Sequence, residues 1–247
     1  MSTTTIPGSP TRPTAIAPRS VERNSRNFCL SIPASTMSFA GFREWATSDK
    51  FPEDIQVAYL GGEIFIDMSP ERLGIHNAAK SEINHVLYQL VRSLDLGRYM
   101  TDGMLVSNEA ADLSNEPEGM FVSWETLRSG RAQFIATASE DDCREILGTP
   151  DAVVEVVSPS SERKDYEVLR ERYHLAGIPE YWLVDGREDK LVFIIFRHQP
   201  LGYVEIDPVD GWLVSSVFNR KFMLERSRAR DDNWQYTLHI APLDPVV

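Results

Sequence analysis

The stretch PDAVVEVVSPSS, residues 150–161, constrains the fold more than any other part of the chain. Its apolar run is typical of a buried strand, and a serine-capped helical pattern follows over residues 160–177. Gly177 and Pro179 end that helix, and EYWLVD, residues 180–185, has the pattern of the next strand. A helix that connects two strands of one sheet makes those strands parallel.

The other patterns predict antiparallel strands and one more long helix. Apolar residues recur with a 3.6-residue period between Ile75 and Leu96, and Gly61-Gly62 lies between two alternating runs that form a predicted hairpin. MSFAGFREWATS (37–48), with Ser38 as a cap, predicts a short helix, whereas YMTDGMLVSNE (99–109) and GMFVSWETL (119–127) each predict one strand. We therefore expect an α/β (α+β) fold, a mixed sheet flanked by helices with extra N- and C-terminal antiparallel hairpins.

Composition is that of an ordinary globular protein, with 247 residues, 42% hydrophobic and 25% charged. No apolar run approaches the roughly 20 residues that span a bilayer, and the N-terminus lacks the apolar region of a secretory signal. The two cysteines, Cys29 and Cys143, have no metal or disulfide spacing. These features predict a cytoplasmic protein without a membrane segment.

Charge is uneven along the chain. Residues 1–26 carry four arginines against one glutamate, or +3, so the net charge of −12 leaves −12 − 3 = −15 for residues 27–247. We expect residues 1–26 to be a disordered basic tail and 27–247 a single domain. An acidic domain binds nucleic acid only through a local basic patch or a bound cation, so the charge counts against such binding.

Glu155 interrupts the apolar run of the predicted buried strand. Alternation along a strand places Asp151, Val153, Glu155 and Val157 on one face and leaves an entirely apolar core face opposite. A buried carboxylate needs a cation, a set of donors or water, because desolvating an isolated charge costs several kcal/mol. Two interpretations remain open at this point: a salt bridge to Arg163, Arg170 or Arg172, and a functional site.

A second carboxylate favours the functional interpretation. Glu118 follows Pro117 and precedes the predicted strand GMFVS; if that strand neighbours the one with Glu155, the two carboxylates converge. Oxygen ligands alone suit a hard cation such as Mg²⁺ or Mn²⁺, which supports phosphodiester hydrolysis.

Three further residues are candidates for the edge of this site, each with an ordinary structural alternative. Asp151 is about 13 Å along the strand from Glu155 and equally suits a strand start after Pro150. Glu63, on the predicted hairpin, is a third carboxylate or an exposed charge. His76 lies on the apolar side of the long helix, where a satisfied core histidine is the commoner case.

PDAVVEVVSPSS and RKDYEVLRERYHLAGIPEYWLVD resemble the restriction-endonuclease-like family of the PD-(D/E)XK nuclease superfamily. GEIFIDMSP (62–70) and EPEGMFVSWETLRSG (116–130) match the same family, and the resemblance covers roughly residues 37–205. It implies a restriction-endonuclease-like core and Mg²⁺-dependent cleavage of DNA. By analogy with such nucleases it also implies a homodimer that cuts two strands.

The resemblance assigns the family's two acids to Glu118, where aspartate is usual, and Glu155. The superfamily lysine position is Val157 here, and the helix position to which this family moves its lysine is Leu169. Lys164, Arg163 and Arg170 are the nearby cations, and Lys164 either replaces the missing lysine or is a solvated charge.

Two hypotheses follow for function. The first is a Mg²⁺-dependent DNA endonuclease in which Glu118 and Glu155 bind the metal while Lys164 or Arg170 steadies the scissile phosphate. The second is a catalytically weakened nuclease-fold protein that binds DNA or another protein, which the acidic domain and the missing lysine favour.

Overall fold

The computed structural model describes residues 30–52, 55–67, 76–136 and 143–243. The chain divides into two units, residues 1–32 and 33–247. The predicted basic tail, residues 1–26, lies outside the described residues.

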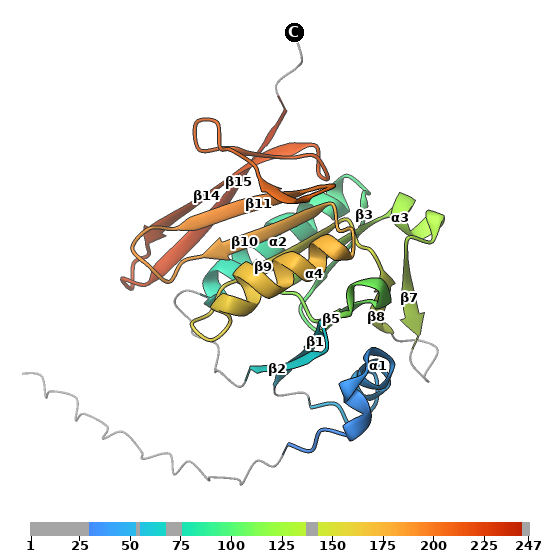
Figure 1. Cartoon of the computed structure of the whole chain (residues 1–247). Coiled ribbons are helices and arrows are strands. Elements are labelled where there is room, and N and C mark those ends of the chain that lie inside the picture. Colours follow the sequence, from blue (N-terminus) through green and yellow to red (C-terminus); the bar gives the residue numbers. More distant parts are fainter. Residues whose placement is uncertain (1–29, 53–54, 68–75, 137–142, 244–247) are drawn as a thin grey trace, which may run out of the picture. The chain divides into compact units, whose positions relative to one another are not determined.

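Helices and strands are mixed along the second unit up to α4, and strands alone follow it (Figure 1). The helical elements are η1 (Ala34–Met37), α1 (Phe39–Ala46), α2 (Ala78–Ser93), η3 (Glu109–Ala111), α3 (Trp124–Ser129), the π-helical segment η4 (Lys164–Leu169) and α4 (Arg170–Leu175). The strands are β1 (Gln56–Leu60), β2 (Glu63–Asp67), β3 (Gly97–Thr101), β4 (Leu105–Asn108), β5 (Leu113–Asn115), β6 (Gly119–Ser123), β7 (Ala132–Ala136), β8 (Cys143–Gly148), β9 (Ala152–Val156), β10 (Glu180–Asp185), β11 (Val192–Gln199), β12 (Gly202–Glu205), β13 (Leu213–Ser215), β14 (Arg220–Arg228) and β15 (Trp234–Pro242). Across the described residues, no helix has the length and apolar character needed to cross a membrane.

The strands form three sheets. The central sheet has the order β12-β11-β10-β9-β6-β3, and only β9 and β10 are parallel in it, as the helical crossover predicts. A second sheet has the order β2-β1-β5-β4-β8-β7, and β13-β14-β15 form an antiparallel third sheet. The predicted fold class, a mixed α+β domain, is confirmed.

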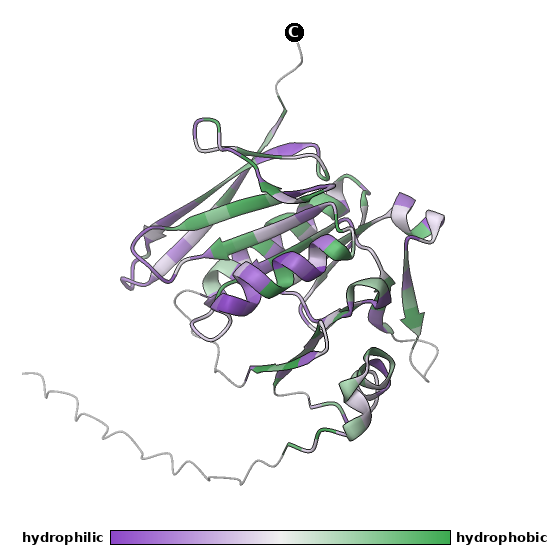
Figure 2. Ribbon diagram, viewed as in Figure 1, coloured by the Kyte–Doolittle hydropathy of each residue, from purple (hydrophilic) through white to green (hydrophobic). Residues whose placement is uncertain are grey.

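Strand β9 is buried on both faces, because helices and sheets cover the central sheet from two sides. Ala152, Val154 and Val156 pack in one core with α2 and the third sheet. Val153 and Val157 pack in the other core with α4 and the second sheet. Figure 2 shows the apolar strands of this sheet beside the amphipathic helix α4. The predicted apolar face and the face that mixes acid with valine are confirmed, and the mixed face is buried as well.

The local predictions succeed where turn and cap signals are strong. The Ser38 side chain accepts a hydrogen bond from the Gly41 amide at the start of α1. Gly61 and Gly62 have φ of 61° and 86° in the turn of the β1–β2 hairpin, where residues with a Cβ are strained. The helix predicted from Ile75 to Leu96 is present as α2; Ile75 itself lies outside the described residues.

One predicted strand is wrong and four strands are missed. YMTDGMLVSNE is two strands in different sheets, β3 and β4, because Asp102 and Gly103 take positive φ values of 25° and 80° between them. Strands β5, β7, β8 and β14 are absent from the prediction. In β14, arginine and lysine interrupt the apolar alternation on which strand recognition depends.

A buried carboxylate fastens the third sheet to the central one. Glu180, at the start of β10, is fully buried and contacts no cation among the described residues. Its oxygens accept hydrogen bonds from Trp182 Nε1 (3.1 Å), Ser215 Oγ (2.6 Å), the Ser216 amide (2.7 Å) and hydroxyl (2.8 Å), and the Val217 amide (3.2 Å). Five donors replace the water that the carboxylate loses.

We predict that Glu180→Ala lowers the free energy of unfolding by about 3–5 kcal/mol, because it leaves several buried donors without an acceptor. Urea denaturation measures the loss. The exposed Glu205→Ala on β12 is the matched control and should change stability by about 0.5 kcal/mol or less. Equal stability of the two variants would show that Glu180 is no anchor.

Candidate functional site

The pairing of β6 with β9 sets Glu118 beside Glu155. The strands are antiparallel, with Gly119 opposite Val154, so one further step of the same register puts Glu118 at the level of Glu155. Opposite residues of an antiparallel pair share a face, and Val153, on the same face of β9 as Glu155, packs in the core with α4. The predicted neighbourhood of the two strands is confirmed.

Helix α2 and the turn before it supply the partners of Glu118. His76 Nε2 lies 3.2 Å from Glu118 Oε1, and Lys80 Nζ lies 3.0 Å from Glu118 Oε2 and 3.0 Å from Asp102 Oδ2. Asn84 Nδ2 donates to the Glu118 backbone carbonyl at 2.8 Å. His76, Lys80 and Asn84 are spaced by four residues, so one side of the helix faces the same strand end.

Glu118 stays ionised although it is only 5% exposed. Burial alone raises the pKa of this carboxyl group, but the hydrogen bond and charge of His76, together with the charge of Lys80, lower it below its ordinary value. Glu118 is thus a buried carboxylate held charged by neighbouring cations.

Glu155 has the opposite protonation state. It is 2% exposed, and its Oε1 accepts hydrogen bonds from Tyr173 Oη (2.6 Å) and Asn115 Nδ2 (3.0 Å). Burial raises the pKa of this carboxyl group to about 8, against the lowering effect of the Lys164 charge. Glu155 is therefore largely protonated at neutral pH.

Lys164 begins the π-helical segment η4 and is the cation on which several carboxylates act. Its side chain is 13% exposed, and its Nζ lies 3.6 Å from Asp165 Oδ1. Burial lowers the pKa of this lysine, but the charges of Asp165, Glu155, Glu118 and Asp67 raise it above the ordinary value. Lys164 is hence a charged ammonium group among acids from four parts of the chain.

Asp165 adds a third buried carboxyl group beside Lys164. It is 1% exposed, and burial raises its pKa to about 6. The Ser161 hydroxyl donates to Asp165 Oδ2, while the other oxygen, Oδ1, makes no hydrogen bond with a described residue.

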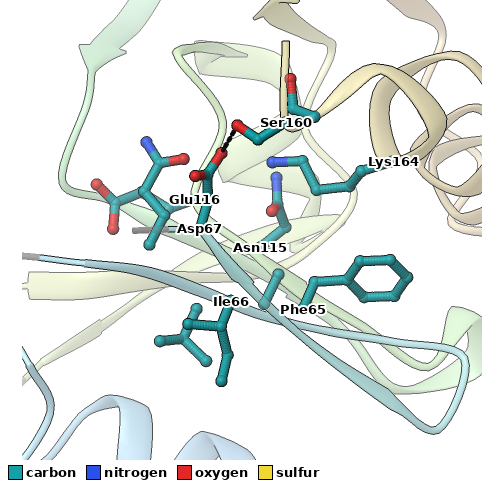
Figure 3. A pocket seen from close by; sticks show the side chains of 11 residues that line it. Phe65, Ile66, Asp67, Asn115, Glu116, Ser160 and Lys164 are labelled. Carbon is teal, nitrogen blue, oxygen red and sulfur yellow. Dashed lines mark hydrogen bonds between the residues drawn. The ribbon is translucent and has the colours of Figure 1, made fainter. Parts of the chain in front are cut away.

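A pocket opens next to this cluster (Figure 3). Lys164 and Asn115 line it, and their side chains reach toward the Asp67 carboxylate, which accepts a hydrogen bond from Ser160 Oγ at 2.8 Å. Its lining is Gln56, Val57, Ala58, Phe65, Ile66, Asp67, Asn115, Glu116, Ser160, Ser161 and Lys164. Neither Glu118 nor Glu155 lines the pocket. Asn115 and Lys164 therefore belong both to the pocket and to the surroundings of Glu155.

Glu118, Glu155 and Asp165 are the donors available for the Mg²⁺ that the resemblance implies. Within the described ranges, no three His, Cys, Asp or Glu side chains are grouped to hold a metal. Glu118 Oε2 and Asp165 Oδ1 have no hydrogen-bond partner among the described residues and lie 3.0 Å from Lys80 Nζ and 3.6 Å from Lys164 Nζ, respectively. Glu118 and Glu155 would thus supply two carboxylate ligands, the small number that suits a hard cation that keeps several waters, as Mg²⁺ does.

Glu63 and Arg170, two of the predicted site residues, lie away from the Glu118–Glu155 cluster. Glu63 is exposed at the turn end of β2, and Asp67 at the other end of the strand lines the pocket instead. Arg170 stacks over Phe196 at 4.5 Å and donates to the Tyr203 carbonyl at 3.3 Å, so it points into the core-facing surface of α4. Assigning Glu63 to the site edge and Arg170 to the phosphate is therefore wrong.

Asp151 is a structural residue at the opposite end of β9. It accepts hydrogen bonds from the Ser123 amide (2.6 Å) and Thr126 Oγ1 (2.9 Å), and it pairs with Arg131. Its contacts hold the start of α3 in place, and it does not lie at the edge of the site. This agrees with the alternative interpretation of Asp151 as a residue at the start of a strand.

The sequence analysis missed several residues of the cluster. A salt bridge from Glu155 to Arg163, Arg170 or Arg172 is absent among the described contacts; Asn115 and Tyr173 take that place. Lys80, Asp165 and Asp67 are the other omissions. The spacing of Lys80, four residues after His76, was the one available signal, whereas Asn115 reaches Glu155 only through tertiary packing.

The fold and sequence match known proteins. A family model described as "Putative restriction endonuclease" (Uma2) matches residues 39–224. A crystal structure of a "putative nuclease belonging to DUF820" from Anabaena variabilis aligns with a TM-score of 0.54 and 20% sequence identity, covering 73% of this chain and 90% of that chain. No curated protein matches. The chain belongs to the Uma2 family, whose description is "Putative restriction endonuclease".

Proposed function

We propose that the protein is a divalent-metal-dependent DNA endonuclease. The observation that carries this proposal is the convergence of Glu118, Glu155 and the Lys164 ammonium group on one end of the β6–β9 pair. Two acids from adjacent strands and one lysine are the groups that phosphodiester hydrolysis needs: oxygen ligands for a hard cation and a positive charge for the phosphate. Family membership supports the same reaction class.

Glu118 and Glu155 would hold the cation, Mg²⁺ or Mn²⁺, with Asp165 next to them. When bound, such a cation supplies Lewis-acid polarisation of the phosphodiester and offsets negative charge in the transition state. Tyr173 and Asn115 orient the Glu155 carboxyl group through their hydrogen bonds. His76 and Lys80 keep Glu118 ionised, so it is ready to bind a cation.

Lys164 takes the role of the missing family lysine. Val157 and Leu169, the two positions where the resemblance expects a lysine, are both fully buried in the apolar core. Lys164 instead reaches the carboxylates from the first turn of η4 and also lines the pocket, where it can contact a scissile phosphate. Its raised pKa keeps it charged and suits it to stabilising a phosphate rather than to acting as a base.

A second candidate function is a nuclease-fold protein that binds DNA or protein without cleaving. The specific observation in its favour is that Lys80 and His76 already neutralise Glu118, while Glu155 is 2% exposed and outside the pocket. Such a site binds a metal only if the cation competes with the lysine and with the Glu155 proton.

We predict that Glu155→Gln and Glu118→Gln each lower the rate of plasmid nicking in Mg²⁺ or Mn²⁺ by about 100-fold or more, because each removes a carboxyl group that would bind the cation as a carboxylate. Glu63→Gln is the matched control, since Glu63 is exposed at the far end of β2, and it should cleave like wild type. Wild-type protein that nicks no DNA with either metal would exclude the endonuclease and leave the binding function.

We predict that Lys164→Met lowers cleavage about 100-fold while Lys164→Arg retains part of the activity, because the charge next to the phosphate is lost in one and kept in the other. Lys50→Met, at an exposed lysine after α1, is the control. The nicking assay gives all three rates. Full activity of Lys164→Met would remove Lys164 from the site.

The metal-free protein should show a pH dependence that Glu155 causes. Its carboxyl pKa is about 8 in the folded chain against an ordinary 4.5, so the folded state retains a proton that the unfolded state loses. The stability from this group is complete below about pH 4.5 and is lost as the pH rises to about 8.

We therefore predict that, in EDTA, the free energy of unfolding of wild type falls relative to Glu155→Gln by about 2 kcal/mol between pH 6 and pH 8. Urea denaturation of both proteins at the two pH values measures it. A constant difference between the two proteins would mean that Glu155 is already ionised at pH 6.

A further inference from the structure

An arginine–tryptophan cluster, Arg226, Arg228 and Trp234, lies at the tip of the β14–β15 hairpin. The guanidinium carbons of Arg226 and Arg228 are 4.1 Å and 3.6 Å from the centre of the Trp234 ring. Arg228 is directly opposite Trp234 in the strand register and is exposed. Stacking on an indole ring holds a guanidinium group in place and leaves its N–H edge available for hydrogen bonds.

The cluster is tied to the turn between β10 and β11. Arg226 Nη1 donates to the Gly186 carbonyl (2.8 Å), and its Nη2 donates to the carbonyls of Glu188 (3.0 Å) and Asp189 (2.6 Å). These three hydrogen bonds to backbone carbonyls hold the Arg226 guanidinium group against this turn. Arg228 donates one bond, from Nη1 to the Asp232 carbonyl at 2.7 Å.

The same turn is tied to the start of η4, where Lys164 lies. Arg187 Nη1 pairs with Glu162 Oε2 at 3.0 Å and Arg187 Nη2 with Asp185 Oδ2 at 2.8 Å. Tyr166, in η4, donates to Asp185 Oδ2 at 3.2 Å. Figure 1 shows the hairpin tip and the start of the η4–α4 helix toward the same end of the central strands, although the third sheet and α4 cover opposite faces of the central sheet. The contacts of Arg226 and Arg187 therefore link the cluster to the start of η4 around this end of the sheet.

Local charge on the hairpin is opposite to that of the protein. The β14–β15 hairpin, residues 220–242, contains five arginines and lysines against three acids, or +5 − 3 = +2, in a chain with a net charge of −12. Of the two acids in its turn, Asp231 accepts hydrogen bonds from the Asn233 amide (3.2 Å) and side chain (2.9 Å). The tip is strongly hydrophilic in Figure 2. The family match ends at residue 224, so the cluster lies beyond it.

We propose that the arginine–tryptophan cluster binds the phosphate backbone of DNA next to the cleavage site, with Arg228 as the contacting group. This inference rests on the proposed function for the identity of the ligand. An aligned guanidinium on the site edge supplies a charge-assisted contact to a phosphate. It also accounts for DNA binding by an acidic chain, because a local basic patch offsets the unfavourable overall charge.

The test is duplex DNA binding by full-length protein in EDTA, measured by fluorescence anisotropy over a range of salt concentrations. Loss of one phosphate contact in Arg228→Gln should weaken binding several-fold and reduce the slope of log affinity against log salt by about 0.9. Arg228→Lys should restore much of the slope because it keeps the charge.

Arg98→Gln is the matched control. Arg98 is an exposed arginine that lies 5.4 Å from the Trp124 ring centre, at the end of the β3–β6 pair away from Glu118. It should leave both affinity and slope unchanged. The proposal is overturned if Arg228→Gln binds like wild type, if Arg98→Gln is impaired equally, or if wild type binds no duplex.

These results are separable from those of the cleavage assay. Binding that depends on Arg228 without any nicking in Mg²⁺ or Mn²⁺ would support the hairpin contact and reject the nuclease. Nicking with unchanged binding of Arg228→Gln would reject the hairpin contact alone.

Discussion

Placing two carboxyl groups at the same level of β6 and β9 is the constraint on which the rest of the site depends. Glu118 and Glu155 are both buried, so the surrounding elements must supply donors and positive charge. α2 does so for Glu118 through His76 and Lys80, and η4 does so for Glu155 through Lys164. Because the two carboxyl groups receive different donors and charges, their pKa values differ: that of Glu118 is lowered, whereas that of Glu155 is raised to about 8. Two chemically alike acids thus have pKa values shifted in opposite directions by their different surroundings.

The position of the cluster follows from the connection between β9 and β10. A parallel pair requires a crossover, and the crossover helix begins immediately beyond the carboxyl end of β9. Side chains from that first turn necessarily lie near the last residues of the strand. Lys164, Asp165 and Ser161 are therefore close to Glu155 for a topological reason.

Much of this arrangement is readable from the sequence, and the limits have physical causes. The strands around Glu118 and Glu155 and the helix after Ser161 have strong local patterns, so their order and the parallel pair could be predicted. Lys80 could not be assigned to Glu118, because the orientation of α2 on the sheet depends on packing between distant segments. Asn115 was equally hidden, since it reaches Glu155 from another sheet. Arg170 was misplaced because spacing on a helix does not show which side faces Phe196.

The burial of Val157 and Leu169 has a consequence for how relatives of this chain are recognised. Both positions are sealed in the same apolar core, so a charged side chain at either would have to displace packed neighbours. A lysine at either position is incompatible with this core packing. A cationic side chain that reaches Glu118 and Glu155 must therefore come from a different part of the segment that connects β9 to β10. A search pattern fixed to linear motif positions would discard such chains as inactive. A criterion based on which ammonium group approaches the paired carboxylates in space would retain them.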